Sequence, residues 1–228
     1  MHSKGKFIVL EGTDGSGKTT QFNKLIARLE KEKHHIATFD FPQYTKPSSY
    51  FVKEYLNGRY GTIDQVGPYR ASIFYALDRF DVGPEIIKWI NEGKVILSNR
   101  YVSSNMGHQG AKIKSAKARK KYFMWLDEFE YGLLGIPRPD LNIVLHVPAG
   151  IAQKLVDEKS QRKYIGGKKR DLHEANLAHL KRAEQTYREM AKIFPKDFKL
   201  IQCVDKNKLL SIEEVHEKVL LAVRHLTS

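Results

Sequence analysis

Long apolar segments, a signal-peptide core and paired cysteines are all missing from this sequence of 228 residues. No run approaches the roughly 20 apolar residues that span a bilayer, and the first residues, MHSKGK, contain no apolar core. We therefore expect a cytoplasmic protein without a membrane partner. The single cysteine, Cys203, excludes an intrachain disulfide bond, and its apolar surroundings KLIQCV favour a buried position in a strand over a reactive thiol.

Acidic residues are scarce relative to basic ones, since 39 Lys and Arg stand against 26 Asp and Glu and give a net charge of +13. Such a charge attracts nucleotides, nucleic acids and acidic surfaces, and it does not choose among them. Two segments contain six basic residues each and no acidic one, residues 112–121 (KIKSAKARKK) and 159–170 (KSQRKYIGGKKR). A solvated helix face or loop would explain the first of them equally well.

Five short apolar runs alternate with segments of helical character. The predicted strands are 7–11, 36–41, 95–99, 142–147 and 198–204. The predicted helices are 18–33, 68–92, 114–134, 149–158, 172–193 and 211–226, the last opening with Ser211 and Glu214 in the spacing of a capping box. Continuous rather than alternating apolar runs are typical of strands buried on both faces. The sequence therefore predicts one α/β domain over residues 1–228, with a parallel five-stranded sheet and helices on both faces.

The stretch EGTDGSGKTT, residues 11–20, follows the first predicted strand and contains the G-x-x-x-x-G-K-[ST] pattern of a phosphate-binding loop. Glycines let the backbone wrap around phosphate oxygens, and the following helix adds unpaired N–H groups. Lys18 is expected to reach the β and γ phosphates, and the Thr19 hydroxyl to bind Mg2+. The candidate nucleotide-binding residues are Gly12, Thr13, Asp14, Gly15, Ser16, Gly17, Lys18, Thr19 and Thr20. Kinases, GTPases, motors and regulatory binding modules all share this pattern.

Several stretches resemble the thymidylate kinase family in order and spacing. They are LEGTDGSGKTT at 10–20, FP at 41–42, YALDR at 75–79, NRYVSSN at 99–105, PD at 139–140 and the basic stretch before RDLHE. The resemblance covers nearly the whole chain and implies a P-loop kinase fold with a basic lid at about 159–171. It also implies ATP as phosphoryl donor, Mg2+ as cofactor, conversion of dTMP to dTDP in dTTP synthesis for DNA replication, and a homodimer.

Tyr75 and Arg79 are four residues apart, so on a helix they share one face. An aromatic ring with a guanidinium suits a planar base. The resemblance implies that Tyr75 stacks on thymine and that Arg79 binds the base or the acceptor phosphate, although Tyr75 could also be an ordinary core residue. Asn105 and His108 would face the deoxyribose and base, with an ordinary loop histidine as the other interpretation of His108, and Ser104 is a further candidate contact.

Arg100 follows the third predicted strand, at the edge of the sheet where ligands of this architecture collect. A guanidinium there can bridge donor and acceptor phosphates, and the resemblance implies this role. It further implies that Asp14 meets the acceptor's 3′-hydroxyl or a water beside the phosphates. The loop FPQYTK supplies the candidate acceptor-binding residues Phe41, Pro42, Tyr44 and Lys46, although many relatives have an arginine in this loop.

Two positions depart from the family pattern. Gly15 stands where some members carry a catalytic arginine, so the lid is expected to supply that group from Arg162 or Arg170. Asn99 stands where the family usually has an aspartate that orients Mg2+-bound water. An amide carries no charge, so the sequence predicts a raised Mg2+ requirement or a larger share for Asp14. The adenine of the donor is expected near residues 204–208.

Two alternatives stay open. The first is a kinase for another nucleoside monophosphate such as dUMP, which the Asn99 and QYTK departures favour. The second is a P-loop module whose positive charge follows a nucleic-acid backbone, which would show strongly salt-dependent binding. We do not expect the second, because the kinase interpretation accounts for at least one of the two basic segments. The nine histidines show no convincing metal-ligand spacing.

Overall fold

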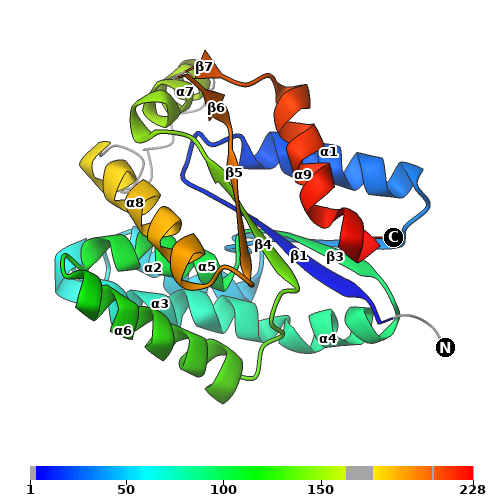
Figure 1. Cartoon of the computed structure of the whole chain (residues 1–228). Coiled ribbons are helices and arrows are strands. Elements are labelled where there is room, and N and C mark those ends of the chain that lie inside the picture. Colours follow the sequence, from blue (N-terminus) through cyan, green and yellow to red (C-terminus); the bar gives the residue numbers. More distant parts are fainter. Residues whose placement is uncertain (1–3, 163–176, 207, 228) are drawn as a thin grey trace.

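The computed structural model describes residues 4–162, 177–206 and 208–227, without the side chains of residues 159–162. Five strands form one sheet in the order β2-β3-β1-β4-β5, and every neighbouring pair is parallel (Figure 1). They are β1 (Lys6–Glu11), β2 (Ile36–Asp40), β3 (Val95–Asn99), β4 (Leu141–His146) and β5 (Phe198–Gln202). The predicted parallel five-stranded α/β sheet is confirmed.

Helices cover both faces of this sheet (Figure 1). On one face lie α1 (Lys18–Lys31), α7 (Ala149–Arg162) and α9 (Ile212–Thr227). On the other lie α4 (Gly83–Asn91), α5 (Val102–His108), α6 (Ala116–Asp127) and α8 (Leu177–Ile193). Beside them, α2 (Tyr50–Leu56) and α3 (Ile63–Asp81) share a small cluster of their own. The remaining short elements are η1 (Pro47–Ser49), η2 (Gly110–Lys112), the π-helical η3 (Glu128–Leu133) and a hairpin of β6 (Val204–Asp205) and β7 (Lys208–Leu209).

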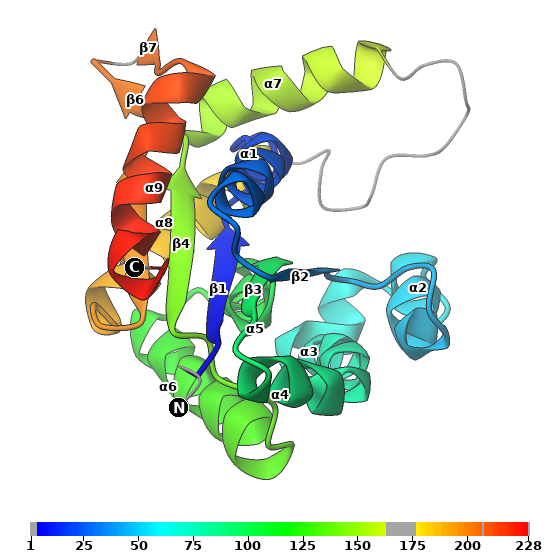
Figure 2. The same ribbon diagram turned by 90° about the vertical axis from the view of Figure 1, so that its right-hand side faces the viewer.

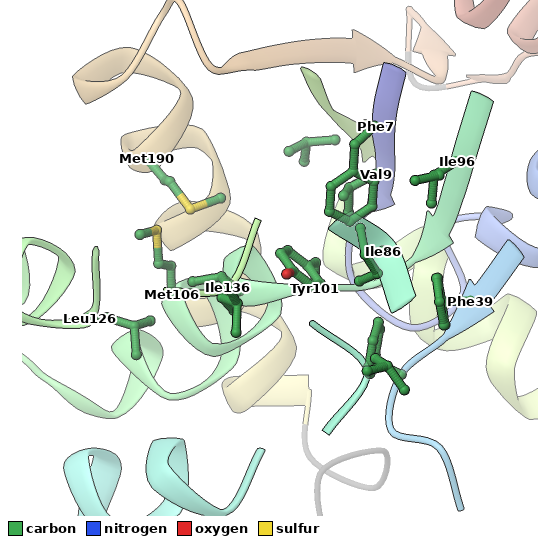
Figure 3. Packing of buried hydrophobic residues seen from close by; sticks show 14 of the residues in the cluster. Phe7, Val9, Phe39, Ile86, Ile96, Tyr101, Met106, Leu126, Ile136 and Met190 are labelled. Atoms are coloured by element: carbon green, nitrogen blue, oxygen red, sulfur yellow. The ribbon is translucent and has the colours of Figure 1, made fainter. Parts of the chain in front are cut away.

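The sheet packs against a separate apolar cluster on each face. Figure 3 shows Phe7, Val9 and Ile96 of the sheet in one cluster with Tyr101 and Met106. Alternate residues of the same strands pack on the opposite face against α1 and α9. Burial on two faces is therefore confirmed for β1, β3 and β4, whereas the edge strands β2 and β5 have exposed residues and do not follow the prediction.

The helical segment predicted at 68–92 is wrong in its boundaries. α3 begins earlier, at Ile63, with a capping box between Thr62 and Gln65, and bends at Gly67, whose φ is 72°. A break at Val82 then separates α3 from α4. The predicted strand 198–204 likewise divides into β5 and β6, whereas the capping box of Ser211 and Glu214 is confirmed.

Cys203 is 2% exposed, and burial raises the pKa of its thiol to about 11, so its predicted burial is confirmed, although it lies between β5 and β6 and not within a strand. No helix in the described part of the chain combines the length and the apolarity that crossing a membrane requires.

The fold gathers the candidate residues at one edge of the sheet. The carboxyl ends of β1 and β4 point to this edge, and α7 lies above it (Figure 2). The loop after β1 and the turn after β3 are neighbours there, because β1 and β3 pair in parallel. Connections leave β1 and β3 toward opposite sides of the sheet, which is the switch point where ligands of open α/β sheets bind.

Candidate functional site at the carboxyl edge of the sheet

The phosphate-binding loop joins β1 to α1. Gly17 takes the left-handed conformation at the start of α1, with φ 84°, and no described side chain caps the helix there. The first N–H groups of α1 and the positive end of its dipole therefore face the loop. Lys18 Nζ donates hydrogen bonds to the carbonyls of Gly12 (2.9 Å) and Thr13 (2.8 Å), which holds the ammonium over the loop.

Gly15 brings the loop into contact with α7. Its φ is 80°, and a Cβ atom at this position would lie 2.2 Å from the carbonyl oxygen of Ala152. A side chain there would therefore collide with helix backbone. The arginine that some relatives carry at this position cannot be accommodated here unless α7 moves.

Arg100 stands at the turn between β3 and α5. Its φ is 69°, an unusual conformation for a non-glycine residue, and its N–H donates to the Leu10 carbonyl at 2.9 Å. The guanidinium donates from Nη2 to the Asp14 carboxylate and from Nη1 to His108 Nε2 at 3.0 Å. Burial disfavours the charge, but Asp14 together with Tyr187, Glu11 and Tyr44 outweighs this effect and raises the pKa of Arg100. The structure thus brings Asp14, Lys18, Arg100 and His108 together, as the sequence motifs suggested.

Glu11 holds the start of α5 against β1, a role that the sequence does not predict. Its buried carboxylate accepts four hydrogen bonds, from Tyr101 N (2.9 Å), Ser103 Oγ (2.9 Å), Ser104 Oγ (2.8 Å) and Tyr187 OH (2.9 Å). Three of these donors lie at the start of α5, so Glu11 ties that helix to β1 and α8. A charged residue ending a buried strand was the only signal in the sequence.

Of the residues predicted to bind the nucleoside, Tyr75 is partly exposed, whereas Arg79 and Asn105 are buried. Tyr75 is partly exposed and packs edge-on against Tyr55, with ring centroids 6.3 Å apart. Arg79 is 2% exposed and donates two hydrogen bonds to the buried Glu130, at 2.6 and 2.7 Å. Asn105 is 3% exposed and donates to the Ser72 carbonyl at 3.1 Å. Arg79 and Asn105 therefore make internal hydrogen bonds, whereas Tyr75 is partly exposed.

The loop after β2 is held by Asp78, a residue of the YALDR stretch whose role the sequence does not indicate. Asp78 is 1% exposed and accepts from Gln43 N at 2.8 Å and from Ser48 Oγ at 2.6 Å. Tyr44 is 48% exposed on this loop, next to the partly exposed Pro42. Phe41 by contrast is buried among the rings of Phe39 and Tyr101, so it supports the loop from the core.

Two buried polar atoms at this edge have no hydrogen-bond partner among the described residues, Ser16 Oγ in the loop and Asn99 Oδ1 at the end of β3. The other end of the Asn99 amide, Nδ2, donates to Asp40 Oδ1 at 2.9 Å. Buried polar groups are normally paired, so these two atoms are available to an ordered water, a ligand or an ion beside the phosphate-binding loop.

Several candidates lie at or beyond the limits of the described residues. Of the lid predicted at about 159–171, residues 159–162, which include Arg162, form the end of α7 without described side chains, and residues 163–171, Arg170 included, lie outside the described residues. Residue 207 in the predicted adenine loop lies outside them as well. Thr19 and Thr20 are exposed in the first turn of α1. In segment 112–121, Lys112 donates to Tyr55 OH and Arg119 pairs with Glu189, so structural roles explain part of its basic character.

The sheet order, the phosphate-binding loop between β1 and α1 and the arginine after β3 define a P-loop kinase fold. A solved thymidylate kinase from Candida albicans has the same fold, with a TM-score of 0.69, 22% identity, and coverage of 97% of this chain and 92% of that one. The family model for thymidylate kinase matches residues 10–219. The chain belongs to the thymidylate kinase family and is an enzyme of the nucleoside monophosphate kinase class.

Individual relatives agree with this assignment. A thymidylate kinase of Mycobacterium tuberculosis is 30% identical over 185 residues, which cover 81% of this chain and 85% of the relative. A probable thymidylate kinase of Pyrococcus abyssi is 27% identical and covers 97% of both chains. A thymidylate kinase of Schizosaccharomyces pombe is 26% identical, with coverage of 95% and 90%.

Proposed function

We propose that this chain transfers the γ-phosphoryl group of ATP to the 5′-phosphate of dTMP, giving ADP and dTDP for dTTP synthesis. The family match over residues 10–219 carries this proposal, since it includes the phosphate-binding loop, Tyr75 and Arg100. The same match makes a nucleic-acid-binding module the weaker alternative. Its test is direct detection of dTDP formed from dTMP and ATP by the wild-type chain, with Lys18→Ala as the inactive control.

The donor phosphates are bound by the backbone of the loop and by Lys18. Residues 12–17 and the first turn of α1 present N–H donors, and Ser16 Oγ adds a buried hydroxyl without a protein partner among the described residues. The Lys18 ammonium, which donates to two loop carbonyls, needs only to turn away from them to contact phosphate oxygens bound in the loop. In-line transfer then depends on alignment and charge stabilisation rather than covalent chemistry.

The acceptor is placed by residues on the other side of the loop. Arg100 lies between Asp14 and His108, where its guanidinium can contact both sets of phosphates and offset the charge that crowds as they approach. Asp14 accepts a hydrogen bond from the 3′-hydroxyl or from a water beside the phosphates. Tyr75 stacks on thymine, and Tyr44 and Lys46 extend from the exposed loop toward the acceptor phosphate.

The site fits Mg2+ by the chemistry of its donors. The available groups are hard oxygens, the Thr19 hydroxyl, the Asp14 carboxylate and the buried Asn99 carbonyl oxygen. Mg2+ in such sites retains several waters and takes one or two protein oxygens plus phosphates. When bound, it neutralises charge on the β and γ phosphates.

A lid arginine completes the proposed machinery, because Gly15 leaves no room for one in the loop. Arg162 and Arg170 are the candidates, and the catalytic one contributes roughly 10³ to 10⁵ in rate if it acts as an arginine finger. Steady-state assays of Arg162→Ala and Arg170→Ala test this. Two variants with near wild-type rates would contradict the lid hypothesis.

We also propose that the enzyme is a cytoplasmic homodimer. The outer side of α3 presents Tyr69, Leu77 and Phe80 exposed, with the partly buried Ile73 between them, at spacings of four, four and three residues. Such an apolar stripe on one helix face fits a second copy of the chain. Light scattering should show a dimer for wild type and a monomer for Leu77→Glu. Leu221→Glu, which changes a more exposed leucine on α9 (72% against 37% for Leu77), should stay dimeric.

A further inference from the structure

Asp40 and Asn99 form a pair at the ends of neighbouring strands. They are register partners in β2 and β3, and the Asn99 amide donates to the Asp40 carboxylate at 2.9 Å. An ionised carboxylate only accepts hydrogen bonds, so it fixes the orientation of the amide, with Nδ2 toward Asp40 and Oδ1 away from it. Asn99 is 8% exposed, and its Oδ1 has no hydrogen-bond partner in the described part of the chain.

The pair lies on the face of the sheet that the phosphate-binding helix covers. Val95 and Leu97 pack in the cluster that contains Phe22 and Leu25 of α1. Side chains alternate along a strand, so Asn99, two residues beyond Leu97, shares this face. Asp40 is two residues beyond Thr38 and pairs with Asn99 across the strands, so both point toward the end of the sheet where α1 begins at Lys18.

The surroundings of this pair are cationic. Burial raises the pKa of Asp40, while the hydrogen bond from Asn99 and the nearby charges of Arg100 and Lys18 oppose that rise. Both cations belong to the proposed phosphate site. A carboxylate is therefore held close to the position of the donor phosphates, although it forms no ion pair within 4.0 Å among the described residues.

We propose that Asp40 and Asn99 act as one unit that positions Mg2+ through its bound waters, with Asp40 supplying the negative charge and Asn99 Oδ1 a second acceptor. This inference rests on the proposed use of Mg2+ and ATP. Waters on Mg2+ are strong hydrogen-bond donors, and a carboxylate plus an unpaired carbonyl oxygen are matched acceptors for them. Asp40, at the end of β2, thereby supplies the negative charge that the neutral amide of Asn99, at the end of β3, lacks.

The test measures nucleotide affinity rather than turnover. Titration calorimetry of ADP into the full chain, over a series of Mg2+ concentrations, gives the Mg2+ concentration at which affinity is half enhanced. Asp40→Asn should raise that concentration about 10- to 100-fold, the usual effect of losing an outer-sphere partner of a bound metal. The double variant Asp40→Asn/Asn99→Asp exchanges the two groups and should return it toward the wild-type value.

Two further variants serve as controls. Glu217→Gln removes one charge from the exposed side of α9 and should leave the Mg2+ dependence unchanged. Asp40→Glu keeps the carboxylate and should lie close to wild type, which covers the case in which Asp40→Asn does not fold.

Asn99→Ala should also raise the Mg2+ requirement, because it removes the second oxygen. Asn99→Asp alone is a poor test, since it places two carboxylates at hydrogen-bonding distance.

The outcomes separate this inference from the proposed function. A folded Asp40→Asn variant with an unchanged Mg2+ dependence, or a folded exchange variant without recovery, would overturn the inference and leave Asp40 as a structural acceptor for Asn99. A wild-type chain whose affinity for ADP does not respond to Mg2+ would overturn it as well. No binding of ADP or ATP under any condition would reject the proposed function itself.

Discussion

The ion pair between Arg79 and Glu130 is the most strongly buried charge pair in the described structure, with side chains 2% and 0% exposed. Glu130 accepts two hydrogen bonds from Arg79, and its Oε1 lies 3.3 Å from Asn105 Nδ2. Burial disfavours the charge of Arg79, but Glu130 outweighs this effect and raises the pKa of the guanidinium. Glu130→Gln keeps the shape of the side chain and leaves this buried charge uncompensated.

Removing one partner of such a pair costs about 3–5 kcal/mol of unfolding free energy. For a protein of this size each kcal/mol lowers Tm by roughly 2–4 °C, so we expect Tm to fall by roughly 6–20 °C. Arg79→Met should cost a similar amount. The double variant Arg79→Met/Glu130→Gln should lose much less than the sum of the single losses, because no unpaired charge remains.

Urea and thermal unfolding of the four proteins measure these values. Glu32→Gln is the matched control, since Glu32 pairs with Arg28 on the surface at 2.6 Å with both side chains largely exposed, and its loss should cost at most about 0.5 kcal/mol. Losses below 1 kcal/mol in the buried variants, or additive losses in the double variant, would refute the reasoning. A stable Arg79→Met protein with weakened dTMP binding would instead support the substrate role that the family resemblance gives to Arg79.

Three further predictions concern the site and its surroundings. Arg100→Ala should lower kcat about 10²- to 10³-fold, as loss of a donor that stabilises developing charge does, while calorimetry still detects ATP binding; an unchanged kcat would exclude Arg100 from phosphate bridging. Gly15→Ala should destabilise the protein and weaken nucleotide binding, because its Cβ would lie 2.2 Å from the Ala152 carbonyl; normal melting and binding would show that α7 moves freely. Burial lowers the pKa of Lys112 from 10.5 to about 8, so the unfolded chain holds this proton to higher pH and the contribution of Lys112 to stability should rise between about pH 8 and 10.5. This contribution is on the order of 3 kcal/mol, and urea unfolding should show it as a growing difference in unfolding free energy between wild type and Lys112→Met, and this difference cancels the opposing effect of the raised Cys203 pKa; a constant difference would contradict it.

The sheet could be predicted because its central strands β1, β3 and β4 are continuous apolar runs, a signal that burial on two faces imposes on the sequence itself. The start of α5 could not be predicted, because SSNMGH has weak helix propensity. Its first turn is fixed by Glu11, which lies some 90 residues earlier in the chain. The break at Val82 was missed for a similar reason, since the apolar pattern of α3 continues into α4.

In the site, too, features encoded by local sequence could be predicted, and features fixed by contacts distant in the chain could not. The phosphate-binding loop and Arg100 lie in local motifs that a sequence displays directly. Asp78, Glu130 and Asp40 act through partners that are distant in the chain or on another strand, so their roles emerge only from the fold. The internal bonds of Arg79 could not be foreseen from its spacing to Tyr75, because that spacing specifies a helix face and not what covers it.

The central claim is that this P-loop kinase phosphorylates dTMP. The measurement that tests it most directly is coupled ADP release with ATP and Mg2+ across dTMP, dUMP, dCMP, dGMP, AMP and UMP, each against a reaction without acceptor. We predict a strong preference for dTMP that is lost in Lys18→Ala. ATP hydrolysis that no acceptor stimulates, or a preference for another monophosphate such as dUMP, would contradict the claim.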